Sequence, residues 1–219
     1  MPSSAIRAVA FDFDETLYDR DAAVRRLVHA WLPGISAAQE TEFLLRDGRG
    51  YGERGPLFDW FKGLLPPGRT SGDLEVRFRR ELPLFLLPDP AAPTVIEAIQ
   101  GMGFVTGILT NGGPDYQRAK LAASGLLPWF HPDKVIVSGE IGWHKPDVRA
   151  FEVLAEACGF RPCEMLYVGD HLGNDIVGGK AAGLQTCWYR RRDPGMEHQD
   201  ADYCIDSLAE LLTLSVFTR

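Results

Sequence analysis

Two aspartates separated by one residue, Asp12 and Asp14, are the side chains whose spacing most clearly suggests chemistry. They follow the apolar run Ile6–Phe11, which is too short for a helix and predicts a buried strand. Because side chains alternate between the two faces of an extended chain, both carboxylates point to the same side at the strand's carboxyl end. Asp12 can then attack phosphorus, and Asp14 can give a proton to the leaving oxygen and later take one from water. Taken alone, the pattern also fits an acidic turn or a helix cap.

A phosphate-binding turn is expected after the strand predicted at 104–109. Thr110, Asn111 and Gly112 form this turn, and Pro114 is a favourable first residue for the helix that follows. The Thr110 hydroxyl and the amides of the loop can donate to phosphate oxygens, and glycine lets the backbone approach an anion closely. Asn-Gly is also a common turn dipeptide, so an ordinary strand-to-helix turn remains the alternative.

Lys145 supplies the positive charge that a phosphoryl group requires. The following Pro146 keeps it out of helical geometry and places it in a loop, from which its ammonium can project into a cleft. There it would neutralise phosphate and keep a carboxylate nucleophile ionised. A solvated surface lysine is the alternative when this residue is considered alone.

Asp170 and Asp175 follow another predicted strand, at 164–168, in a turn that contains glycine. Carboxylate oxygens are the ligands that Mg²⁺ takes, with water and substrate phosphate completing its octahedron. We therefore expect Mg²⁺ to bind at Asp12, Asp170 and Asp175, the last of them directly or through water. The alternative is that Asn174 or Asp175 only caps the helix that follows.

Together, these segments resemble the four motifs of the haloacid dehalogenase superfamily of hydrolases, in the family's order and over most of the predicted core. The resemblance implies that Asp12 is the nucleophile and that Asp14 is the general acid/base, whose backbone neighbourhood also offers a carbonyl to the metal. The namesake dehalogenases lack the second aspartate, so Asp14 points to the phosphatase branch, as does Thr16. The matching residues are Asp12, Asp14, Thr16, Thr110, Lys145, Gly169, Asp170, Asn174 and Asp175.

The elements that must position these residues form a regular series. Apolar strands and amphipathic helices alternate from about residue 94 onward, which predicts a Rossmann-like α/β fold with a parallel sheet covered on both faces. In such sheets ligands bind at the carboxyl ends of the strands, where all four segments fall. The expected strands span 6–11, 104–109, 134–138, 164–168, 185–189 and 202–205, and the expected helices span 94–102, 114–124, 147–158, 174–182 and 207–214.

Residues 20–88 interrupt this alternation with helical patterns and no comparable strand. We expect an all-helical cap here, inserted into an α/β catalytic core formed by residues 1–19 and 89–219. The family resemblance implies the same arrangement, because many members carry a helical cap at this position. A cap would exclude water and select the substrate. The expected cap helices lie near 20–32, 37–46 and 71–82.

A glycine-rich segment from Arg46 to Gly55 is the most unusual part of this insertion. Its glycines would let the chain approach a ligand, which Arg49, Tyr51 and Arg54 could bind. A solvated loop with ordinary charges is the alternative. The apolar residues that follow, Leu57, Phe58, Trp60 and Phe61, are expected to pack inside the cap.

Composition limits the partners that such an enzyme would have. The 219 residues carry a formal net charge of -7 and a pI near 5.3, which argues against nucleic acid and membrane surfaces as partners. The four cysteines form no CxxC pair, and no segment has the length and apolarity of a signal peptide or a membrane span, so we expect a reduced, cytoplasmic protein. A monomer or homodimer acting on a small phosphorylated metabolite fits these constraints.

These observations favour a Mg²⁺-dependent phosphatase that works through an aspartyl-phosphate on Asp12. A phosphomutase would use the same nucleophile and metal but return the phosphoryl group to a sugar, and a 2-haloacid dehalogenase is a further alternative on the same fold. A non-enzymatic phospho-receiver module would also combine acidic residues, a threonine and a lysine on a parallel sheet. It needs neither the insertion at 20–88 nor a second acidic turn, which disfavours it.

Overall fold

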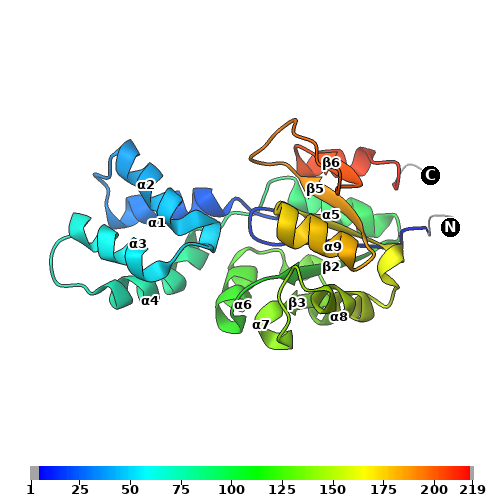
Figure 1. Ribbon diagram of the computed structural model, residues 1–219, viewed down its shortest axis with the longest axis horizontal. Helices are drawn as coiled ribbons and strands as arrows, with labels where there is room; N and C mark the ends of the chain where they lie inside the picture. Colours follow the sequence, from blue (N-terminus) through cyan, green and yellow to red (C-terminus); the bar gives the residue numbers. More distant parts are fainter. Residues whose placement is uncertain (1–4, 218–219) are drawn as a thin grey trace. The chain divides into compact units, whose positions relative to one another are not determined.

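The computed structural model describes residues 5–217 and divides the chain into two compact units, shown in Figure 1. One unit comprises the described residues up to Tyr18 together with those from Pro88 onward, and the other is the continuous segment Asp19–Leu87. The division falls one residue before each boundary that the sequence suggests. Within residues 5–217, no helix has both the length and the apolar character needed to cross a membrane.

A six-stranded parallel sheet forms the centre of the first unit, in the order β3-β2-β1-β4-β5-β6. The expected Rossmann-like α/β fold is therefore confirmed. In the register of the sheet, Ala8 lies between Val105 and Met165, so the first strand has neighbours from much later in the chain on both sides. The strands are β1 (Ala8–Phe11), β2 (Val105–Thr110), β3 (Val135–Val137), β4 (Met165–Gly169), β5 (Gln185–Tyr189) and β6 (Tyr203–Ile205).

Helices flank this sheet, and alternate residues of its first strand pack against one of them. Ala8 and Ala10 on one face of β1 belong to the same buried cluster as Phe151 and Leu154 of helix α8, as the two-residue period of a strand requires. The helices of this unit are α5 (Ala92–Gly101), α6 (Pro114–Ala123), α7 (Ser138–Ile141), α8 (Val148–Cys158) and α9 (Gly178–Ala181), with short 3₁₀ turns at Leu127–Trp129, Pro132–Lys134 and Pro162–Glu164.

Two helices of this unit differ from their expected form. The segment expected as one helix over 174–182 begins earlier, as a π-helical turn at Leu172–Val177, and only then continues as α9. Widened turns of this kind are common at functional sites, and here the turn carries Asp175. The segment expected at 207–214 is a 3₁₀ helix at Leu208–Thr213.

The second unit is entirely helical over the residues described, and three of its four α-helices begin at a residue whose side chain caps them. Ser36 and Thr70 each form a reciprocal capping box with the residue three positions later, and Asp19 caps the first helix. The helices are α1 (Arg20–Trp31), α2 (Ala37–Asp47), α3 (Arg54–Phe61) and α4 (Ser71–Glu81), with 3₁₀ turns at Gly48–Gly50, Lys62–Leu64 and Leu82–Phe85.

Aromatic side chains from these helices form the core of the second unit. The ring centroids of Phe43 and Phe61 lie 4.9 Å apart and those of Phe58 and Phe78 lie 5.6 Å apart, both edge to face. Helix α3 is not among the helices that the sequence suggests, because glycine and proline in its first turn lower its local propensity. Packing of its apolar face outweighs that propensity. Leu57, Phe58 and Phe61 are buried, as expected, while Trp60 is half-buried.

Candidate active site

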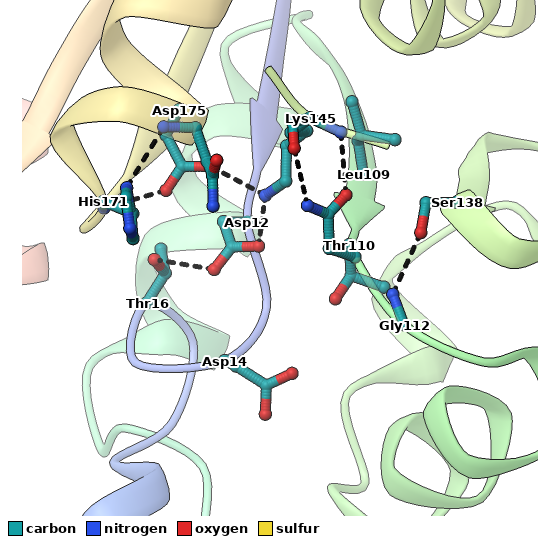
Figure 2. Close-up of polar contacts among 12 residues, drawn as sticks. Asp12, Asp14, Thr16, Leu109, Thr110, Gly112, Ser138, Lys145, His171 and Asp175 are labelled. Carbon is teal, nitrogen blue, oxygen red and sulfur yellow. Dashed lines mark hydrogen bonds and ion pairs between the residues drawn. The ribbon is translucent and has the colours of Figure 1, made fainter. Parts of the chain in front are cut away.

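The four motif segments come together at the carboxyl ends of the three central strands of the sheet, β2, β1 and β4. Because β1 lies between β2 and β4, the residues that follow these strands become neighbours. Figure 2 shows Asp12, Thr110 and Asp175 converging there, with Lys145 reaching the same place from the loop before α8. Residues far apart in sequence therefore meet where the sequence suggests that they should.

Lys145 is the centre of this group. Its side chain is buried, and its ammonium donates to Asp12 Oδ1 at 2.5 Å, to Asp175 Oδ1 at 2.7 Å and to Tyr167 Oη at 2.9 Å. These bonds use all three protons of the ammonium. Burial lowers the pKa of Lys145, but the carboxylates of Asp12 and Asp175 outweigh it, so the pKa stands well above its ordinary value. Lys145 is therefore a fixed positive charge at the site.

A third carboxylate, from Asp170, lies beside the two that Lys145 binds. One oxygen from each of Asp12, Asp170 and Asp175 lies within 4.8 Å of the others. Burial raises the pKa of Asp12 to about 7 even though Lys145 lowers it. The pKa of Asp170 is raised well above its ordinary value, mainly by burial and to a smaller degree by the negative charges of Asp175 and Asp12. Lys145 therefore does not fully offset the negative charge of these carboxylates, and the cluster favours a further cation. Carboxylate oxygens are hard donors that suit a divalent ion such as Mg²⁺.

The backbone around this cluster is shaped to fit its carboxylates. Asp175 Oδ2 accepts a hydrogen bond from the His171 N–H at 2.9 Å, which the π-helical turn allows. A side chain on Gly169 would overlap the Asp175 carboxylate, so only glycine fits at this position. Thr16 Oγ1 lies 3.4 Å from Asp12 Oδ2 and donates to it. Of these two residues of the matching motifs, Thr16 thus donates a hydrogen bond to one carboxylate and Gly169 leaves room for another.

The expected phosphate-binding turn lies at this edge, but several of its polar groups already bind other parts of the protein. The Asn111 amide donates to the Lys145 carbonyl and accepts from the Lys145 N–H, both at 2.9 Å. The Gly112 N–H donates to Ser138 Oγ at 2.9 Å, and Thr110 Oγ1 accepts from Gln117. Asn111 therefore positions the lysine loop, a role that its place in a turn does not indicate.

Asp14 lies apart from the Asp12 cluster. In Figure 2 its carboxylate stands away from the carboxylates around Lys145. Its two oxygens each lie 2.5 Å from Lys120 Nζ on α6, one of them also accepts from Gln117 Nε2 at 2.9 Å, and the Tyr18 hydroxyl donates to the other. Lys120 and Gln117 belong to none of the four segments.

A signal for these two residues is present in the sequence. Positions spaced three and four residues apart lie on one face of a helix: glutamine, lysine and leucine stand at 117, 120 and 121 of α6, and serine follows the helix at 124. All four are buried. An inner helix face with so many polar residues is unusual for a face that packs on a core, and it indicates a polar site.

The suggested substrate residues of the second unit have different surroundings from one another. Arg54 donates to Asp47 and to the Gly50 carbonyl, so its guanidinium is engaged within the helical unit. Arg49 adopts a left-handed backbone conformation with φ of 57°, and it and Tyr51 are exposed. Of the three, Arg49 and Tyr51 keep exposed side chains.

Comparison with known proteins adds a family and several relatives. The family model of haloacid dehalogenase-like hydrolases matches residues 6–183. A glyceraldehyde 3-phosphate phosphatase of Methanopyrus kandleri is 32% identical over 94% of this chain and 96% of its own length. A phosphoserine phosphatase of Thermus thermophilus is 36% identical over 61% of this chain and 50% of its own.

The fold has close counterparts among solved structures. The magnesium-bound HAD-hydrolase YfnB of Bacillus subtilis superposes with a TM-score of 0.73 at 28% identity, covering 96% of this chain and 98% of that one. The likeness therefore extends over both units as well as the motif segments.

Proposed function

Because the chain belongs to the haloacid dehalogenase-like hydrolases, we propose that it hydrolyses the phosphate monoester of a small metabolite through an aspartyl-phosphate on Asp12. The observation that carries the proposal is the direct contact between Lys145 and Asp12 inside a cluster of three carboxylates. A buried carboxylate held by a fixed ammonium is oriented for attack on an electrophile. Relatives named as phosphatases support phosphorus as that electrophile.

In the first half of the reaction, an Asp12 carboxylate oxygen attacks phosphorus and the bond to the leaving oxygen breaks. Lys145 holds Asp12 in place and offsets negative charge at the transferring group. Asp14 gives its proton to the leaving oxygen. In the second half, water attacks the phosphorus of the aspartyl-phosphate, Asp14 takes a proton from that water, and phosphate leaves with Asp12 regenerated.

Mg²⁺ is the cofactor that the carboxylate cluster fits best. Asp12, Asp170 and Asp175 would hold it, with Asp175 contributing directly or through water and the Asp14 backbone offering a further oxygen. When bound, the ion would offset the charge of the cluster and polarise the phosphoryl group. The loop containing Thr110, Asn111 and Gly112 would bind phosphate oxygens through its remaining donors.

A small phosphorylated metabolite is the substrate class that we propose. The relative with near-complete coverage is named for glyceraldehyde 3-phosphate, and the partial relative for phosphoserine. We further propose that the helical unit acts as a cap that selects the leaving group, with Arg49 and Tyr51 as the exposed candidates for contact and Arg54 as a weaker one. The four free cysteines support action in a reducing compartment such as the cytoplasm.

The experiment that tests the proposal measures hydrolysis of 4-nitrophenyl phosphate with Mg²⁺ and with excess chelator. A panel of triose phosphates, phosphoserine and nucleoside monophosphates then ranks substrates by kcat/KM. We expect activity that chelation abolishes and Mg²⁺ restores, with free phosphate as the product. Undiminished activity in chelator would overturn the metal-dependent mechanism, and transfer of the phosphoryl group to a sugar hydroxyl would assign a phosphomutase instead.

A further inference from the structure

Helix α6 carries two buried polar side chains that the reaction described above leaves without a role. Gln117 and Lys120 lie three residues apart, on one face of the helix, and are 1% and 3% exposed. Burying an ammonium is strongly unfavourable unless it is fully paired, and burying an amide is unfavourable to a smaller degree. Such residues are kept where their pairing serves the fold or the site.

The Lys120 ammonium is directed at Asp14. Its Nζ lies 2.5 Å from each carboxylate oxygen of Asp14 and 3.5 Å from Tyr18 Oη. The same ammonium lies over the rings of Phe13 and Tyr116, with 5.8 Å and 5.0 Å to the centroids. Aromatic faces favour a cation and exclude water. Lys120 is thus buried beside aromatic rings and paired with the proposed general acid/base, Asp14, whose side chain is 22% exposed.

Gln117 joins Asp14 to the phosphate-binding turn. Its Nε2 donates to Asp14 Oδ2 at 2.9 Å, to Thr110 Oγ1 at 2.6 Å and to the Asn111 carbonyl at 2.8 Å. Because all three partners accept a hydrogen bond, the end of the Gln117 amide that faces them is its nitrogen. The side chain also runs against Gly112, whose φ is 149° and where a Cβ would lie 2.7 Å from Gln117 Cγ. One amide therefore links the acid/base to the loop that would bind phosphate.

We propose that Lys120 and Gln117 are positioning residues for Asp14, setting the place of its carboxyl group relative to the phosphate-binding turn. This inference rests on the proposed function, since it assumes that Asp14 moves the proton of the leaving group. In this role both residues would act through Asp14 rather than on the substrate itself. An acid misplaced by about 1 Å can cost on the order of a hundredfold in rate, because proton transfer needs hydrogen-bond reach. Losing these contacts weakens the hold on the Asp14 carboxyl group, to which the Tyr18 hydroxyl still donates, and lets it shift out of that reach.

The test compares leaving groups, because a poor leaving group needs the acid and a good one does not. The values of kcat/KM for an alkyl phosphate and for 4-nitrophenyl phosphate are measured for wild type, Lys120→Met, Lys120→Arg and Asp14→Asn. We expect Lys120→Met to lose roughly ten- to a hundredfold on the alkyl phosphate and less than about threefold on the nitrophenyl ester. Lys120→Arg should recover part of the loss, since a guanidinium can also bind both oxygens of a carboxylate.

Arg118→Met is the matched control. Arg118 lies on the same helix and forms an ion pair with Glu140, at 2.6 Å, rather than with Asp14. Its removal should change the two substrates equally, if at all. Gln117→Met, which keeps the length of the side chain and the ion pair of Lys120, makes the same test should Lys120→Met fail to fold. Adding Lys120→Met to Asp14→Asn should cost nothing further, because a residue that acts through Asp14 has no effect once Asp14 is removed.

Several outcomes would overturn the inference. Equal losses on both substrates, or losses that add to those of Asp14→Asn, would show a structural or substrate-binding role. Unchanged activity, or a gain on the alkyl phosphate, would show that the contacts do not place Asp14 for proton transfer. If Asp14→Asn itself shows no dependence on the leaving group, the general-acid step of the proposed function is wrong, and the inference falls with it.

Discussion

Two buried clusters of charged side chains, one in each unit, are built in opposite ways. In the α/β unit, one ammonium, from Lys145, bonds two of three clustered carboxylates: it pairs with Asp12 and Asp175, and Asp170 is the third. In the helical unit, one fully buried carboxylate, from Asp47, lies between the guanidinium groups of Arg20 and Arg54.

Their effects on the carboxyl groups also differ in sign. Burial raises the pKa of Asp12 to about 7, and Lys145 does not cancel it. Burial acts in the same direction on Asp47, but Arg20 and Arg54 outweigh it and hold the pKa of that carboxyl below its ordinary value. The Gly50 N–H adds a further hydrogen bond to Asp47, at 3.0 Å. A compensated cluster stabilises a fold, whereas an anion-rich one leaves a place for a cation and for chemistry.

Asp12→Asn has the largest expected effect and tests the anion-rich cluster. We expect its turnover of 4-nitrophenyl phosphate to fall by at least ~10⁴-fold and its phosphoenzyme to disappear, because no nucleophile remains. Its thermal midpoint without metal should equal or exceed that of wild type, since a poorly compensated buried charge is removed. Rapid acid quench and calorimetry make the two measurements. A phosphoenzyme formed by Asp12→Asn would assign the attack to another residue.

Lys145→Met removes the positive charge that is hydrogen-bonded to Asp12. We expect kcat/KM for the aryl phosphate to fall by roughly 10³-fold, since both orientation of the nucleophile and charge stabilisation are lost. The rise of the thermal midpoint on adding Mg²⁺ should become larger than in wild type, because the carboxylates then depend more on the metal. An unchanged response to Mg²⁺ would separate the lysine from the carboxylate cluster.

Asp47→Ala tests the compensated cluster. We expect it to lower the unfolding free energy of the helical unit by about 3 kcal/mol, roughly a hundredfold in the equilibrium, because two arginines lose their buried partner. Hydrogen exchange read peptide by peptide over Asp19–Leu87 measures this loss. Peptides from the six strands serve as the internal control. Equal exchange in mutant and wild type would mean that solvent replaces Asp47 at little cost.

The smallest effect is the dependence on pH, and its sign should differ between clusters. The folded-state pKa of Asp47 is lowered, so its contribution to stability is present above its ordinary value of 3.8 and is lost as pH falls below it. The folded-state pKa of Asp12 is raised, so without metal its contribution declines as pH rises between about 4 and about 7. Each slope is at most about 1.4 kcal/mol per pH unit.

Matched variants isolate these slopes. The stability difference between wild type and Asp47→Asn should shrink as the pH is lowered below about 4, whereas that between wild type and Asp12→Asn should change between about pH 4 and 7 in chelator. Chemical denaturation at each pH provides the measurement. The same sign for both pairs would mean that the two clusters are not compensated differently.

Much of the α/β unit could be predicted because its signals are local. Short apolar runs show the strands, and the residues that follow them are Asp12, Thr110 and Asp170. Parallel order then requires these ends to meet, although Lys145 and Asp12 are separated by 133 positions. The roles of these residues come from the resemblance of the motifs, and the family match confirms the family.

Other features depend on pairings that a single sequence does not display. Arg54 was suggested as a substrate ligand, yet its guanidinium bonds Asp47, and nothing in the glycine-rich segment shows which arginine an aspartate will bind. Helix α3 forms because Phe58 and Phe61 pack on an aromatic cluster, a tertiary effect that outweighs local propensity. The partners of Asp14 on α6 were accessible only through the polar inner face of that helix.

The position of β1 in the sheet has a consequence for synthesis of the chain. Of the described strands, β1 is translated first, yet its two neighbours in the sheet begin at Val105 and Met165. The helices of Asp19–Leu87 make their described core contacts within one continuous stretch of chain, so they can form before the strands that pair with β1 have been synthesised. Until β4 emerges from the ribosome, one edge of an apolar strand stays open to other chains. Translation that stalls before β4 therefore leaves an unpaired edge of β1 through which the nascent protein can aggregate.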